Sequence, residues 1–185
     1  NYLYGETMTH ILGYVGRIND RDVERLKKEE KFANYSGSTD MGKLGIERYY
    51  EEQLHGTTGF EEVEINNRGK VIRKLREQPA TAGKSIHLTI DLALQRYIMS
   101  LLSGQKGAVV VLDPKDNSVL AMVSTPSYDN NLFVDGISAS DYKRLLNDPA
   151  RPLYSRATQG VYPPASTVKP FVAVAALTEG VITPH

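Results

Sequence analysis

The stretch Gly160-Val-Tyr-Pro-Pro-Ala-Ser-Thr-Val-Lys-Pro-Phe171 sets both the fold and the chemistry of this sequence. The apolar run Phe171–Leu177 continues it and predicts a buried helix that begins at Ser166, after the rigid Tyr-Pro-Pro-Ala segment. Ser166 and Lys169 then lie one turn apart on one face, so the lysine amine can take the serine proton. Free N–H groups at a helix start favour negative charge on the serine oxygen. The plainer interpretation makes Ser166 a helix N-cap and Lys169 a surface charge.

The Ser-x-x-Lys pattern also occurs at Ser103–Lys106 and at Ser140–Lys143. Chance matches are expected because serine and lysine are both common. Gly104 breaks the helical geometry of the first match, and the second is typical of an N-capped surface helix. We therefore place the candidate nucleophile at Ser166.

Other chemistries have little support in the sequence. Basic and acidic residues each number 22, so the formal charge is zero and no nucleic-acid-binding surface is indicated. The chain has no Cys, and no phosphate-binding glycine loop occurs. We expect no metal and no cofactor, because the histidines are scattered without metal-ligand spacing. These histidines are His10, His55, His87 and His185.

The second half of the chain, from residue 84, predicts mixed helices and strands. The expected elements are a strand at Ser85–Ile90, a helix capped by Asp91 and ended by Gly104, a hairpin of Ala108–Leu112 with Val119–Val123, and a short helix at Ser140–Leu146. The rest of Ser124–Ala165 shows little periodicity, and a loop of that length is typically functional.

The first half is more charged and ends in the turn-rich segment Gln78–Gly83, where we place a domain boundary. Its expected elements are a helix at Asp20–Lys28 capped by Asp20, a loop at Ser36–Gly45, a helix at Ile46–Leu54 with Tyr49 and Tyr50 on its packed face, and a hairpin of Glu62–Ile65 with Val71–Leu75. The predicted fold class is α+β, with domains at residues 1–83 and 84–185.

Six segments carry a resemblance to a known family, and together they extend nearly from end to end of the chain. They are Lys43–Glu51, Val63–Ile72, Leu112–Pro114, Val119–Asp129, Asn131–Ile137 and Gly160–Phe171. The chain thereby resembles the class B penicillin-binding proteins, and within them the elongation-specific peptidoglycan transpeptidases of Gram-negative bacteria. The resemblance implies that residues 1–83 are most of a non-catalytic pedestal, or dimerisation, module. Residues 84–185 then open a penicillin-binding transpeptidase domain and end just after the Ser-x-x-Lys helix.

The resemblance implies a serine acyl-enzyme mechanism. Ser166, deprotonated with help from Lys169, attacks the penultimate D-alanine carbonyl of a stem peptide and expels the terminal D-alanine. An amine from a neighbouring stem peptide takes the acyl group and completes the cross-link. β-Lactams mimic the D-alanyl-D-alanine end and acylate the same serine. The Ser166 N–H contributes to the oxyanion hole.

The sequence departs from the family pattern in two ways. Ala165 stands where the family usually has Gly, and we expect this change to be tolerated if φ is negative there. The family's Ser-x-Asn and Lys-Thr-Gly motifs are absent, and losing one oxyanion donor alone lowers a rate about 10²–10³-fold. We expect the chain by itself to be inactive. It starts without Met and stops soon after an apolar run, so we also expect it to be a piece of a longer protein.

The resemblance further implies partners and a location. We expect stem peptides with D-Ala-D-Ala ends and β-lactams as ligands, and a membrane glycan polymerase and the rod-complex scaffold as protein partners. A single membrane anchor is expected upstream of residue 1, at the periplasmic face of the inner membrane. Two other functions stay open, namely a pedestal that docks the elongation machinery through residues 1–83, and a β-lactam sensor that acylates without cross-linking.

Overall fold

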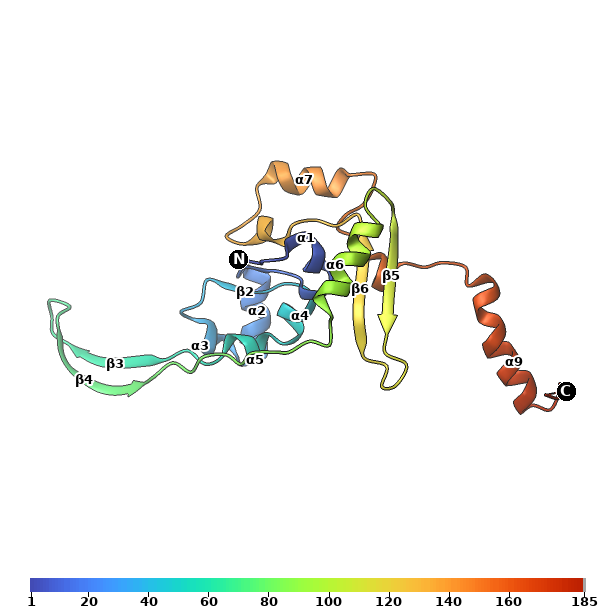
Figure 1. Ribbon diagram of the computed structural model, residues 1–185. Coiled ribbons are helices and arrows are strands. Elements are labelled where there is room, and N and C mark those ends of the chain that lie inside the picture. The colour runs from blue at the N-terminus through green and yellow to red at the C-terminus, as the bar shows by residue number, and fades with distance from the viewer. Residues whose placement is uncertain (185) are drawn as a thin grey trace.

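The computed structural model describes residues 1–184, and His185 lies outside the described residues. Helices and three separate antiparallel strand pairs occur in this range, which confirms the α+β class (Figure 1). Among residues 1–184, no helix has both the length and the apolar character needed to cross a bilayer. The first-half elements are α1 (Gly5–Leu12), β1 (Val15–Arg17), α2 (Asp20–Lys28), α3 (Phe32–Tyr35), β2 (Asp40–Gly42), α4 (Gly45–Tyr49), α5 (Glu51–His55), β3 (Phe60–Ile65) and β4 (Val71–Gln78). The second-half elements are α6 (Leu92–Leu101), β5 (Gly107–Leu112), β6 (Val119–Thr125), η1 (Asn130–Phe133), α7 (Ala139–Asn147), α8 (Arg156–Gln159), η2 (Ala165–Val168) and α9 (Lys169–Thr178).

Helix α2 covers the β1–β2 pair and starts with a reciprocal cap. The Asn19 side chain accepts from the Asp22 N–H at 3.1 Å, and the Asp22 carboxylate accepts from the Asn19 N–H at 3.0 Å. The predicted helix at 20–28 is therefore confirmed, but its cap is Asn19 and not Asp20. The buried core of this region consists of Leu26, Tyr35 and Met41.

Two first-half predictions are wrong. The expected loop at 36–45 contains β2, a strand of three residues, too short to show alternation, that pairs with β1. The expected helix at 46–54 is broken between α4 and α5 at Tyr50. The break lets the Glu51 carboxylate accept from the Gly42 N–H at 2.7 Å, and it leaves Tyr49 80% exposed instead of packed.

The β3–β4 hairpin confirms the expected strand pair and projects away from the other elements (Figure 1). At its turn the Asn66 side chain accepts from the Arg68 and Lys70 N–H groups, and Gly69 has a φ of 74°. Every residue of β4 is exposed. Two strands without further cover are marginally stable in water, so cross-strand ion pairs such as Arg73 with Glu64 add to the ladder.

The second half is built on α6 packed against the β5–β6 hairpin. Asp91 caps α6 by accepting from the Leu94 N–H at 3.0 Å, which confirms both the helix and its cap. The hairpin is also confirmed, and α7 confirms the short helix expected near 140–146. The strand expected at Ser85–Ile90 is wrong, because this segment finds no partner strand to complete a ladder. The buried core here consists of Ile98, Ala121 and Val123.

The N-terminal helix α1, which the sequence did not predict, packs against the second half. The buried Gln95 amide donates to the Thr7 and Met122 carbonyls at 3.0 and 2.8 Å and accepts from the Met122 N–H at 2.8 Å. The Asn130 amide donates to the Gly13 carbonyl at 2.7 Å. Much of the long segment after Ser124 thus serves to hold α1 in place.

Gln95→Met should destabilise the protein by about 3 kcal/mol, because three hydrogen bonds to buried backbone groups are lost at about 1 kcal/mol each. Urea denaturation measures the difference in the free energy of unfolding. Arg96→Met, on the exposed neighbouring position, is the matched control and should stay within about 0.5 kcal/mol of the unmodified protein. Equal effects of the two substitutions would contradict this role of Gln95.

Stability should fall in acid through His10 on α1. Its ring packs edge-on against Tyr128, and burial, followed by the charge of Arg156, lowers the pKa of His10 to about 4. The unfolded state binds the proton first, so this contribution is complete above about pH 6.5 and is lost as the pH falls toward 4.

His10→Phe keeps the ring contact and should remove about 3 kcal/mol of this pH dependence, measured by denaturation at pH 7 and pH 4. His87→Phe, at an exposed position, should leave the pH dependence unchanged. Identical pH profiles for His10→Phe and the unmodified protein would refute the assignment.

Candidate active site

Ser166 lies in the single turn η2, which runs directly into α9. The Lys169 N–H donates to the Ser166 carbonyl, so the two residues are one turn apart along the chain. Pro170 stands in the first turn of α9, where its missing N–H has no helical partner to lose. The sequence therefore predicted the helix start to within one turn.

The structure does not bring the two reactive groups into hydrogen-bonding contact. Within residues 1–184, no hydrogen bond joins Ser166 Oγ to Lys169 Nζ, and both residues are exposed. The Ser166 N–H also donates to no acceptor in this range, so it is free to bind an oxyanion. The candidate serine thus has a free N–H beside it, but the Lys169 amine makes no contact with its hydroxyl.

Helix α9 stands apart from the other elements at the end of an extended segment (Figure 1). The sequence predicted an apolar helix of the buried type that this chain leaves without much of its packing, and among the described residues no α9 residue is buried. Phe171 is 75% exposed and Val174 is 63% exposed. An apolar helix in water lacks the low-dielectric cover that strengthens charge stabilisation in active sites.

Ala165 has a φ of 46°, in the left-handed region. The condition under which Ala was expected to be tolerated, a negative φ, is therefore not met. Left-handed backbone costs a residue with a Cβ roughly 1–2 kcal/mol, and glycine avoids this cost. The methyl group of Ala165 thus places backbone strain directly before the candidate nucleophile.

The other two Ser-x-x-Lys matches occupy different settings. Ser103 follows α6 in a turn where Gly104 has a φ of 74°, and the Lys106 ammonium faces the Pro149 carbonyl at 3.5 Å. Ser140 lies in the first turn of α7, with its hydroxyl 2.9 Å from that of the N-cap Ser138.

A serine–histidine contact in the first half was missed by the sequence interpretation. Ser38 Oγ lies 2.7 Å from His55 Nε2, and the His55 ring stacks on Tyr35 with centroids 4.2 Å apart. Burial, followed by the charge of Glu51, raises the pKa of Tyr35 to about 12. The contact ties the loop before β2 to α5, and no sequence spacing could reveal it because the pair is 17 residues apart on two different segments, a loop and a helix.

Comparisons with known proteins agree with the family resemblance. The family model described as "Penicillin-binding Protein dimerisation domain" matches residues 1–88, and the "Penicillin binding protein transpeptidase domain" matches residues 107–185. Peptidoglycan D,D-transpeptidase MrdA of Haemophilus influenzae is 84% identical over the whole chain, and that of Escherichia coli K12 is 66% identical over 98% of it. The chain spans only 28% and 29% of the lengths of these relatives.

Solved structures agree in fold. PBP2 of Pseudomonas aeruginosa is 45% identical with a TM-score of 0.83, and the match covers 100% of this chain and 36% of that one. A complex of PBP2 and MreC from Helicobacter pylori is matched at 30% identity with a TM-score of 0.86, covering 99% of this chain and 33% of that one.

Ala165→Gly should relieve about 1 kcal/mol of backbone strain in η2. Hydrogen exchange of the Thr167 and Lys169 amides, which donate within this turn, should then slow about fivefold. Ala175→Gly makes the same chemical change inside α9, where glycine is unfavourable, and should instead speed exchange there. Faster exchange of the two η2 amides in Ala165→Gly would contradict the strain.

Proposed function

The chain belongs to the penicillin-binding protein family, and from that membership we propose that the protein is a peptidoglycan D,D-transpeptidase with Ser166 as nucleophile and Lys169 as general base. The 84% identity to a D,D-transpeptidase over the whole chain carries the proposal, because it extends through the Ser-x-x-Lys segment. The position of Ser166 directly before a helix and its free N–H support the assignment.

In the proposed reaction the Ser166 oxygen bonds to the penultimate D-alanine carbonyl carbon while its proton passes to neutral Lys169. The bond to the terminal D-alanine nitrogen breaks, and the protonated lysine returns the proton to that leaving amine. A second amine then attacks the ester, frees Ser166 and completes the cross-link. The Ser166 N–H stabilises the negative oxygen in both steps.

The exposed positions of Ser166 and Lys169 support a corollary for the chain on its own. In residues 1–184 the lysine amine makes no hydrogen bond to the serine hydroxyl, so it is not placed to accept the serine proton, and a single oxyanion donor gives limited stabilisation. The chain alone should therefore be inactive, and elements that cover α9 should restore the chemistry.

A second function is favoured by the H. pylori relative, which forms a complex with MreC. We extend this to the present protein and propose that residues 1–83, as a pedestal, dock a scaffold protein of the same kind. The proposal places the protein at the periplasmic face of the inner membrane, beside a glycan polymerase and its stem-peptide substrates.

A chimera should test the nucleophile. Residues 1–185 joined to the following part of the H. influenzae relative should form one penicillin adduct, mapped to Ser166 by mass spectrometry, and the chain alone should form none. Ser166→Ala should abolish the adduct, and Lys169→Ala should slow acylation by about 10²–10⁴-fold. Ser140→Ala is the matched control and should acylate normally. An adduct on Ser103 or Ser140 would show that the assignment of Ser166 is wrong.

A further inference from the structure

A pocket of about 230 Å³ in the first half is lined almost entirely by charged side chains. Helix α2 supplies part of its wall, and the segment from β2 to α4 supplies the rest. The lining residues are Arg21, Asp22, Arg25, Gly42, Lys43 and Arg48. Four cations thus share one pocket with a single carboxylate.

The one carboxylate in the pocket, that of Asp22, already has three partners in the protein. Asp22 accepts from the Asn19 N–H at 3.0 Å and from the Lys43 ammonium, and its other oxygen lies 3.6 Å from Arg25. Burial raises the pKa of Asp22, but the hydrogen bonds from Lys43 and Asn19 outweigh it and keep the group ionised. Asp22 therefore has little capacity left to neutralise a further cation.

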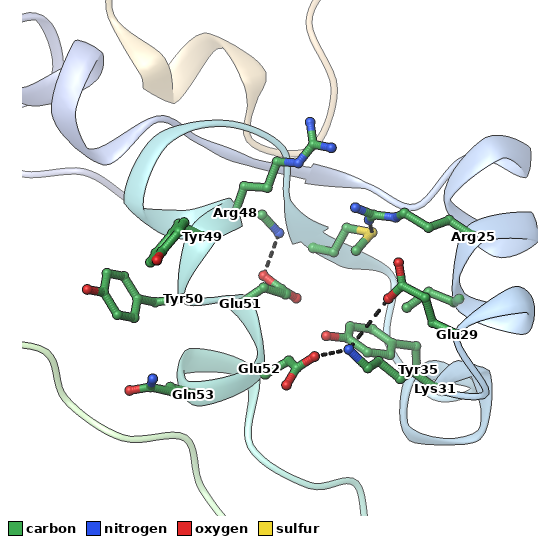
Figure 2. A pocket seen from close by; sticks show the side chains of 13 residues that line it. Arg25, Glu29, Lys31, Tyr35, Arg48, Tyr49, Tyr50, Glu51, Glu52 and Gln53 are labelled. Carbon is green, nitrogen blue, oxygen red and sulfur yellow. Dashed lines mark hydrogen bonds and ion pairs between the residues drawn. The ribbon is translucent and has the colours of Figure 1, made fainter.

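Arg21 and Arg48 have no ion pair within residues 1–184. Figure 2 shows a neighbouring pocket that shares Arg25, Gly42 and Arg48 with this one. Arg48 comes from α4 and Arg25 from α2, and both guanidinium groups lie toward the same side of that view. In this view Glu52 and Lys31 lie farther from the two arginines, and Glu51 lies in between. Lys31 forms ion pairs with Glu52 and Glu29, so these two carboxylates already have a cationic partner other than the arginines.

The backbone fixes the floor of the pocket. A Cβ on Gly42 would lie 2.2 Å from the Glu47 carbonyl oxygen, so only glycine fits, and the Gly42 N–H is held by Glu51 at 2.7 Å. The distance between β2 and α4 is thereby set by close packing. Arg21 and Arg48 are exposed, so guanidinium groups from two elements can reach the oxygens of a tetrahedral anion, which accepts several forked hydrogen bonds at once.

We propose that this pocket binds a multiply charged oxyanion of the phosphate or pyrophosphate class through Arg21, Arg25 and Arg48. A single carboxylate would leave most of the excess positive charge uncompensated, whereas a pyrophosphate group matches it. The ligand is either a free phosphate compound or the headgroup of an anionic phospholipid. The site shares no residue with Ser166 or Lys169 and does not depend on the proposed transpeptidase activity.

Isothermal titration of the 185-residue chain with pyrophosphate, at constant ionic strength, tests the proposal. Arg48→Gln and Arg21→Gln should each weaken binding about tenfold, since a charge-assisted hydrogen bond contributes roughly 1.5–3 kcal/mol. Arg68→Gln removes the same charge at the distant turn of the β3–β4 hairpin and should change the affinity less than twofold.

Sedimentation with vesicles of phosphatidic acid in phosphatidylcholine, whose phosphomonoester headgroup can carry two negative charges, distinguishes the two sources. Vesicle binding that needs Arg21 and Arg48, without binding of free pyrophosphate, identifies the ligand as a lipid headgroup. Pyrophosphate binding with the same dependence, without vesicle binding, identifies a soluble compound. The proposal is overturned if neither probe binds, or if Arg68→Gln weakens binding as much as Arg48→Gln.

Discussion

The amide of Gln95 is the contact on which the arrangement of the two halves depends. It lies on α6, is 1% exposed, and bonds at once to the backbone of α1 and of β6. Because these three hydrogen bonds reach α1 and β6 from one side chain, the amide fixes where α1 lies on the second half. The Asn130 amide makes a similar side-chain hydrogen bond at the other end of α1, where it donates to the Gly13 carbonyl. The start of the chain is thus part of the packing of residues that follow it by about a hundred positions.

Local signals in the sequence were sufficient for the elements whose stability is itself local. Asp91 caps α6, and the Asn66–Gly69 turn joins β3 to β4, because each of these devices acts within a few residues. The sequence failed where distant partners decide the structure. β2 exists because β1 pairs with it, and the helix at 46–54 breaks because Glu51 turns to bond Gly42. Helix α1 was missed because its distinguishing contacts lie on α6 and η1.

In the candidate site, too, the locally determined features could be predicted and the others could not. The sequence predicted a turn from Ser166 to Lys169 followed by an apolar helix. In the structure the helix begins within one turn of the expected residue. The positive φ of Ala165 could not be predicted from the sequence, because alanine by itself favours a negative φ. Only the path of the chain from Tyr162 into η2 imposes the value of 46°. The contact between Ser38 and His55 was missed for the same reason, since the chain path brings a loop residue against the end of α5.

Strain at Ala165 and exposure of α9 act in opposite directions on the proposed nucleophile. A left-handed residue directly before Ser166 fixes the direction in which η2 leaves the preceding segment, which is a form of preorganisation. Exposed apolar side chains on α9 leave the next turn without packing to resist motion. Preorganisation lowers a barrier only when the neighbouring groups are held as well, because a misplacement of about 1 Å can lower a rate about 10²-fold. Cover over α9 would therefore have two effects: it would hold Lys169 near Ser166, and it would exclude water from the site where charge develops on the substrate oxygen.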